Sequence, residues 1–93
     1  MNTESLERIQ YEIDGLRTRA SNIKRGELVS LAEKLGREHR KRGKEPTYVL
    51  KDLPNRPPLS IPSHTKIAKF TALSILDTLE EDVEAWFSRL AKH

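Results

Sequence analysis

A run of basic side chains between residues 37 and 44 carries the clearest chemical signal in this sequence. It reads Arg-Glu-His-Arg-Lys-Arg-Gly-Lys and contains no apolar side chain. Guanidinium and ammonium groups bind phosphate backbones by releasing condensed counterions, so the run predicts contact with a nucleic acid. The alternative is a solvated loop or edge strand. With three lysines nearby, the expected phosphate contacts are Lys24, Arg37, Arg40, Lys41, Arg42, Lys44, Lys66 and Lys69.

The charges of the 93-residue chain are distributed unevenly. Residues 23–70 hold twelve Lys or Arg and five acids, a net charge of +7, whereas the flanks 1–22 and 71–93 are acidic. Positive charge concentrated on one piece of a small protein predicts a polyanionic partner, most commonly nucleic acid. Tyr48 is the only aromatic residue between Tyr11 and Phe70. We therefore expect recognition of an RNA duplex by charge and shape, without base stacking.

His64 is the candidate for acid–base chemistry, because imidazole titrates near neutral pH. The acids nearest to it in sequence are Asp52 and Asp77. A structural hydrogen bond at a strand end is therefore the competing interpretation of this histidine. Cysteine is absent and the histidines lack zinc-ligand spacing, so we expect no metal and no cofactor. The acidic group within residues 80–84 is interpreted as a solvated helix face.

Hydrophobic residues at steps of three and four predict one helix over residues 4–20 and another over 71–90. Thr3 and Thr71 are the expected N-caps. Each helix carries a stripe long enough to bury the other, within one chain or between the two chains of a dimer, with a slight preference for one chain. The stripe residues, which are the expected interface, are Leu6, Ile9, Ile13, Leu16, Leu79, Val83, Trp86 and Leu90.

Between these helices the sequence predicts a shorter helix and a small sheet. The short helix ends at Gly36, a typical left-handed stop. Strand signals follow over residues 47–50 and 59–61, separated by a turn-forming stretch at 52–58. The whole chain is expected to form one α+β domain, in which an antiparallel sheet of two or three strands packs on helices. The absence of a long apolar run and of a signal-peptide pattern predicts no membrane association and a cytoplasmic location.

Three local patterns between Ile23 and Leu79 resemble the HicA family of small toxin-like RNA-binding proteins. The first is the short helix that runs into Leu35-Gly36. The second is Leu59-Ser60-Ile61-Pro62-Ser63-His64, and the third is Thr71-Ala72-Leu73-Ser74-Ile75-Leu76. The resemblance implies a core like the double-stranded-RNA-binding domain over residues 23–79. Residues 1–22 then form an added N-terminal helix, and residues 80–93 extend the last helix.

The same resemblance places a catalytic histidine of the family just after Gly43, where this chain has Glu45. It therefore implies an RNA-binding module that is non-catalytic or weakly catalytic. Two alternatives remain open at this point. One is a ribonuclease that cleaves messenger RNA and uses His64. The other is an interaction module whose hydrophobic stripes bind a HicB-like antitoxin or a second copy of the chain.

Overall fold

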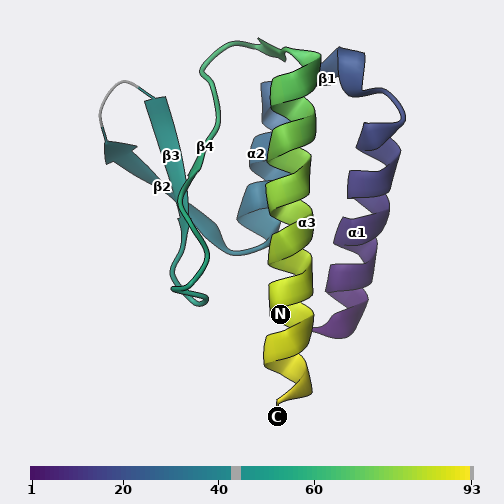
Figure 1. The fold of residues 1–93 in the computed structure, drawn as a ribbon, viewed down its shortest axis with the longest axis vertical. Helices are drawn as coiled ribbons and strands as arrows, with labels where there is room; N and C mark the ends of the chain where they lie inside the picture. The colour runs from purple at the N-terminus through teal and green to yellow at the C-terminus, as the bar shows by residue number, and fades with distance from the viewer. Residues whose placement is uncertain (43–44, 93) are drawn as a thin grey trace.

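The chain folds as an α+β protein, and the computed structural model describes residues 1–42 and 45–92 (Figure 1). The described residues form two antiparallel sheets, with strand orders β1-β5 and β2-β3-β4. The helices and strands are, in chain order, α1 (Thr3–Arg17), the 3-10 turn η1 (Ala20–Asn22), β1 (Ile23–Lys24), α2 (Arg25–Lys34), β2 (Arg37–Arg42), β3 (Glu45–Leu50), β4 (Leu59–Ser60), β5 (Lys66–Ile67) and α3 (Lys69–Ala91).

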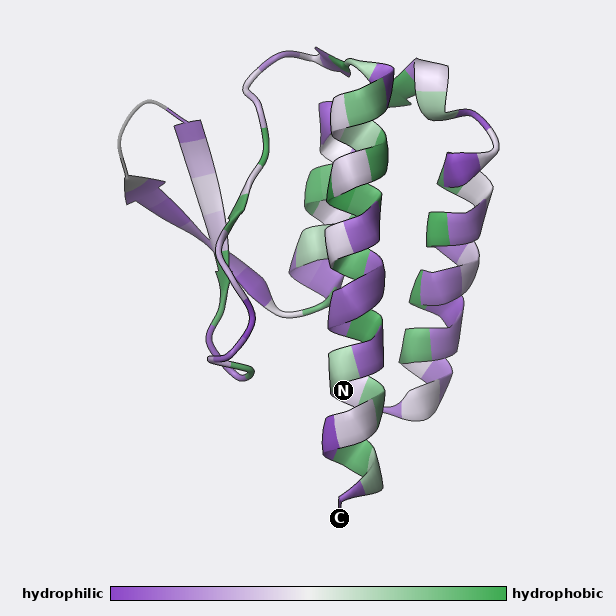
Figure 2. Ribbon diagram, viewed as in Figure 1, coloured by the Kyte–Doolittle hydropathy of each residue, from purple (hydrophilic) through white to green (hydrophobic). Residues whose placement is uncertain are grey.

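The helices α1 and α3 run antiparallel beside each other, with their hydrophobic sides facing inward (Figures 1 and 2). Ile13 of α1 and Leu79 of α3 are fully buried, and Leu90 is partly buried. The other members of the two stripes are buried as well: Leu6, Ile9, Leu16, Val83 and Trp86. The stripes therefore pack against each other within one chain, which is the arrangement that the sequence slightly favoured. An interface to a second copy or to an antitoxin-like partner stays a prediction.

Both predicted helix caps are wrong. Asn2 caps α1, because its side-chain oxygen accepts a hydrogen bond of 2.8 Å from the Ser5 backbone N–H. The cap of α3 is Ala68, whose carbonyl accepts the Ala72 backbone N–H at 2.8 Å. This helix therefore begins before Thr71, and without a side-chain cap.

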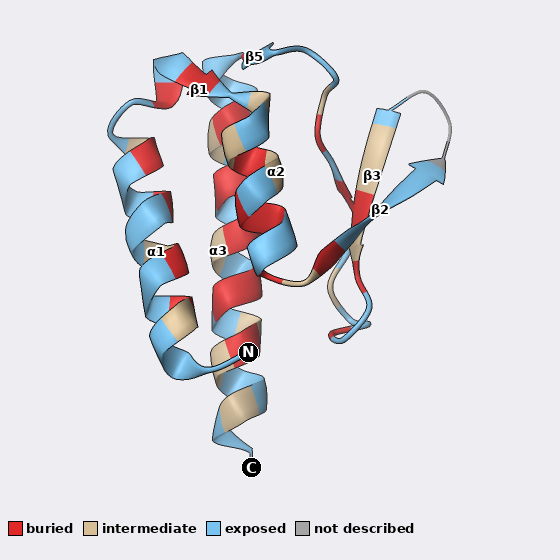
Figure 3. Cartoon of the chain, turned by 180° about the vertical axis from the view of Figure 1, so that it is seen from behind, coloured by how far each residue is buried: buried red, intermediate tan, exposed pale blue. Residues whose placement is uncertain are grey.

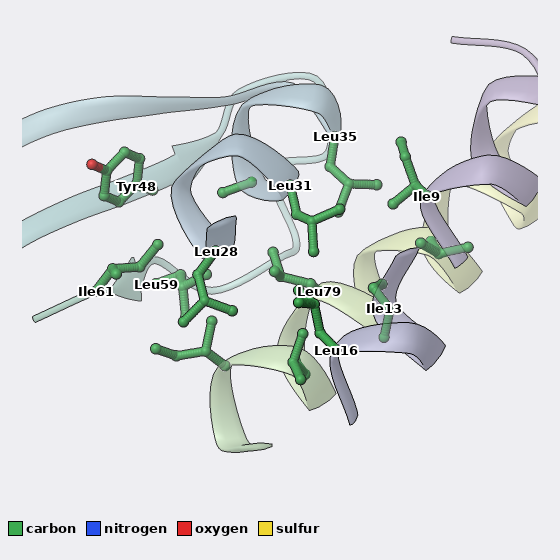
Figure 4. Close-up of a cluster of buried hydrophobic side chains, with 14 of the residues drawn as sticks. Ile9, Ile13, Leu16, Leu28, Leu31, Leu35, Tyr48, Leu59, Ile61 and Leu79 are labelled. Atoms are coloured by element: carbon green, nitrogen blue, oxygen red, sulfur yellow. The ribbon is translucent and has the colours of Figure 1, made fainter. Parts of the chain in front are cut away.

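The basic run of residues 37–42 forms a strand. In the hairpin, Arg37 pairs with Leu50 and His39 with Tyr48, and on the other side of β3 Tyr48 pairs with Leu59. Tyr48, Leu59 and Ile61 lie beside Leu28 of α2 in the hydrophobic cluster of Figure 4. The outer part of the hairpin extends away from the helices and is exposed from residue 38 to residue 41 (Figure 3).

Gly36 turns the chain from α2 into β2 in the left-handed conformation predicted for it, with φ of 97°. Next to it, the Leu35 carbonyl accepts a hydrogen bond of 2.8 Å from the Trp86 indole N–H. That bond satisfies one of the carbonyls that the end of α2 leaves unpaired. Across the described part of the chain, no helix combines the length and the apolar character that crossing a bilayer requires.

Candidate nucleic-acid interface

Three lysines come together where the short sheet β1-β5 meets the first residue of α3. Lys24 and Lys66 are direct cross-strand partners, and Lys69 follows Lys66 by three residues. All three are exposed, and none forms an ion pair with a described residue. Like charges directly opposite each other destabilise a ladder, so folding holds this positive charge together against repulsion. We call Lys24, Lys66 and Lys69 the lysine cluster.

Helix ends add to the positive potential around the lysine cluster. Lys24 is the N-cap of α2, and Lys69 is the first residue of α3, whose first turn contains no acid. The start of a helix carries about half a positive charge, and a cation there is destabilising. Both helices start at the same end of the molecule (Figure 1). An anion bound at this end would meet the lysines and the two dipoles together, with the dipole of α2 partly offset by Glu27 in its first turn.

Arg25 organises the surroundings of the lysine cluster. Its backbone N–H donates to the Thr65 carbonyl at 2.8 Å, and its Nε donates to the Pro62 carbonyl at 2.9 Å. Its Nη2 donates to the Tyr48 hydroxyl at 3.0 Å. Arg25 thus joins the start of α2 to β3 and to the loop that carries His64. That histidine is exposed and makes no hydrogen bond or ion pair with a described residue.

The hairpin presents its cations on two faces. Successive residues of a strand point to opposite sides, so Arg40 and Lys41 diverge. Arg40 lies 4.0 Å from the Glu38 carboxylate, whereas Lys41 shares a face with His39 and forms no ion pair with a described residue. The His39 and Tyr48 rings are 5.3 Å apart on that face. The expected single basic surface is therefore divided at the hairpin.

Two further members of the predicted set, Arg42 and Lys44, follow Lys41 in the sequence. The backbone of Arg42 pairs with Glu45 at the end of the described strands. Lys44 and the neighbouring Gly43 lie outside the described residues. The outer end of the hairpin β2-β3 lies in the same half of the molecule, along its long axis, as the strand β1 (Figures 1 and 3).

Arg37 is not a surface contact, which corrects its place in the predicted set. Its guanidinium is fully buried and bonds both oxygens of the equally buried Asp82 carboxylate, at 2.7 and 2.9 Å. Arg37 also donates to the backbone carbonyls of Tyr48 and Pro57. Arg56 donates to the same Asp82 carboxylate at 2.7 Å. The expectation that Asp82 belongs to a solvated acidic face is wrong as well.

Most other cations of the described chain are paired with acids away from the lysine cluster. Arg17 bonds Asp77 and Glu80 of α3, and Lys34 bonds Glu12 of α1. These pairs hold α1 against its neighbours and leave little free positive charge on that side. The lysine cluster is therefore the main group of cations without acidic partners in the described chain.

Some residues at this end of the molecule were missed by sequence reasoning. Phe70 is 84% exposed beside Lys69. The sequence does indicate that Phe70 is exposed. Phe70 lies two residues before Ala72 and so does not fit the three-and-four spacing of the buried stripe. The role of Arg25 has no such signal, since its partners lie 23 and 37 residues away.

Comparison of the chain with protein-family models, with curated proteins and with solved structures finds no match. The function of this protein is therefore inferred from its own residues.

Proposed function

We propose that this protein is an RNA-binding module of HicA-like type that contacts the phosphate backbone of an RNA duplex. The observation that carries the proposal is the lysine cluster, in which none of the three exposed ammonium groups forms an ion pair with a described residue. Repulsion and two helix dipoles both oppose this arrangement in the free protein. A bound polyanion would relieve both, and Lys41 of the hairpin would extend the contact.

Duplex RNA is the polyanion that fits this arrangement best. Its phosphates and 2′-hydroxyls are recognised by shape and charge across a shallow minor groove, without reading bases. Such recognition needs cations on separate, rigid elements. Here Lys24 and Lys66 are held by a sheet, Lys69 by a helix, and Lys41 by a hairpin. The order of helix, three-stranded antiparallel sheet and helix from α2 to α3 is also the order that the HicA resemblance implies.

The test is a salt titration of binding to a blunt RNA duplex, followed by fluorescence anisotropy. We expect the logarithm of the affinity to fall linearly with the logarithm of the salt concentration. A variant with Lys24→Gln, Lys66→Gln and Lys69→Gln should reduce the slope by about 1 for each phosphate that the protein no longer neutralises. Lys92→Gln is the matched control, since Lys92 is an exposed lysine at the opposite end of α3. Absence of binding at low salt would overturn the proposal.

We propose binding with little or no cleavage. Glu45 stands where the HicA resemblance puts a catalytic histidine, and His64 has no described carboxylate partner to orient its ring. Purified protein and His64→Ala should therefore leave messenger RNA equally intact. Cleavage by the unaltered protein that disappears in His64→Ala would instead establish the ribonuclease alternative.

A further inference from the structure

Phe70 presents an aromatic ring beside the lysine cluster. It is the second residue of α3 and is 84% exposed, whereas phenylalanine is usually buried. A single exposed apolar side chain is common on protein surfaces and indicates no ligand on its own. What distinguishes Phe70 is that Lys69 precedes it directly and Lys66 lies four residues before it, with Lys24 opposite Lys66.

The backbone on either side of Phe70 is fixed by buried neighbours. Ile67 and Ala72 are both buried, and the Ala72 backbone N–H bonds the Ala68 carbonyl at 2.8 Å. The ring therefore projects from a rigid helix start, and ordering it on binding requires little further loss of backbone freedom. The lysines on β1 and β5 are held by the same junction of strand and helix.

We propose that Phe70 stacks on an unpaired RNA base next to the phosphates that the lysine cluster contacts. This inference rests on the proposed RNA binding. A nucleotide joins a flat apolar base to a phosphate, which matches an exposed ring next to ammonium groups. Proteins that bind single strands combine these same two elements, a positive surface and an aromatic platform. The preferred ligand is thus a duplex that carries unpaired nucleotides, not a blunt one.

The charge around Phe70 favours this occupant over a hydrophobic protein segment. An exposed ring that docks into a protein pocket is usually surrounded by a mixed polar rim. The residues that flank Phe70 in the sequence, from Lys66 to Leu76, include two lysines and no acid, and the next residue, Asp77, is paired with Arg17. Such a surface selects an anionic ligand.

The experiment compares a blunt RNA duplex with the same duplex carrying a short unpaired overhang. For the unaltered protein the overhang should increase affinity about tenfold. Phe70→Ala should lose this gain and keep its affinity for the blunt duplex, while Phe70→Trp should retain the gain. Tyr11→Ala is the matched control, because Tyr11 is 80% exposed on α1, a helix that carries none of the three lysines. With 2-aminopurine in the overhang, binding should quench its fluorescence in a Phe70-dependent way.

The outcomes separate this inference from the proposed function. Equal binding of both RNAs by the unaltered protein, or an undiminished gain in Phe70→Ala, overturns base stacking while RNA binding stands. Failure of the unaltered protein to bind either RNA overturns both. Circular dichroism confirms that Phe70→Ala is folded, as expected for a change at an exposed side chain.

Discussion

At the scale of single residues, Arg37 and Asp82 form a buried ion pair that joins the first residue of β2 to the middle of α3. Each side chain has no solvent exposure, and all four bonds of the Arg37 guanidinium go to Asp82 or to backbone carbonyls. A buried pair contributes little net stability compared with apolar residues of the same shape, but breaking it leaves a charge without a partner. The pair therefore fixes the position of the sheet on the helix.

Replacing Asp82 should destabilise the fold severely. Asp82→Ala leaves the Arg37 guanidinium buried without a counter-charge, which costs about 3–5 kcal/mol of unfolding free energy. The measurement is urea unfolding followed by circular dichroism. Glu81→Ala is the matched control, because Glu81 is an exposed neighbour that also contacts Arg56, and it should change stability by less than about 0.5 kcal/mol. Equal stability of the two variants would contradict the structural role of the pair.

At the scale of elements, the junction of α2 and β2 depends on the left-handed backbone of Gly36. A Cβ at this position would lie 3.3 Å from Leu50 Cδ1 and 3.7 Å from the Trp86 ring. The left-handed conformation adds about 1–2 kcal/mol for any residue with a side chain. Gly36→Ala should therefore lower the free energy of unfolding by at least that amount.

Gly15 provides the opposite case within the same protein. It lies inside α1 with a negative φ, and a Cβ there would meet nothing within 4 Å. Gly15→Ala should therefore stabilise the protein by about 1 kcal/mol, through helix propensity. Thermal unfolding of both alanine variants checks the pair. A stabilising Gly36→Ala would show that the connection tolerates another backbone conformation.

The start of α2 has a stability that depends on pH. Hydrogen bonds from the Arg19 side chain and from the Lys24 backbone N–H lower the pKa of the Glu27 carboxyl. A carboxyl with a depressed pKa in the folded state stabilises folding at neutral pH. That contribution is lost as the pH falls below the unfolded value of about 4.3 and through the folded pKa.

Glu27→Gln should therefore be less stable than the unaltered protein near neutral pH, by about 1 kcal/mol. The difference should close in acid, once the pH has fallen through the lowered pKa of Glu27 and the glutamate is protonated. Denaturant unfolding over this pH range measures it. Glu33→Gln, at an exposed position of the same helix, is the matched control. A gap that persists in acid would assign the effect to packing and not to charge.

The long helices and the main hairpin strand could be predicted from the sequence because each follows from a local periodicity. The spacing of Leu6, Ile9 and Ile13 repeats on one helical face, and residues 47–50 carry β-branched and aromatic side chains. The two-residue strands β1 and β5 have no periodicity to read. The burial of Arg37 could not be predicted from the sequence either, since its partner Asp82 is 45 residues away. A run of charged residues is normally expected to be exposed to solvent.

At the scale of the whole molecule, pairing of charges decides which cations remain available. The acids of α1 and α3 neutralise Arg17, Lys34 and Arg56 in the described chain, and no described acid forms an ion pair with the lysine cluster. Net charge along the sequence thus indicated a basic segment correctly, while only the fold divides that segment into buried, paired and free cations. The free ones lie where folding is opposed by their mutual repulsion. Residues that destabilise the folded protein in this way are expected at functional sites, where binding requires them.

Because repulsion within the lysine cluster weakens folding while its charge favours RNA binding, one substitution should change stability and affinity in opposite directions. Lys66→Gln removes the repulsion across β1-β5, so thermal unfolding should show a stabilisation of about 0.5 kcal/mol. The same variant should bind an RNA duplex more weakly, with a salt slope reduced by about 1.

Lys92→Gln should have the opposite effect on stability, because Lys92 caps the C-terminal end of α3, where a cation is favourable. It should lose about 0.5 kcal/mol of stability and leave RNA affinity unchanged. If Lys66→Gln lowered both stability and affinity, the lysine cluster would stabilise the fold, and its charge would no longer indicate a ligand. A Lys66→Gln variant that is more stable but binds RNA more weakly is the result expected if the lysine cluster is an anion-binding surface.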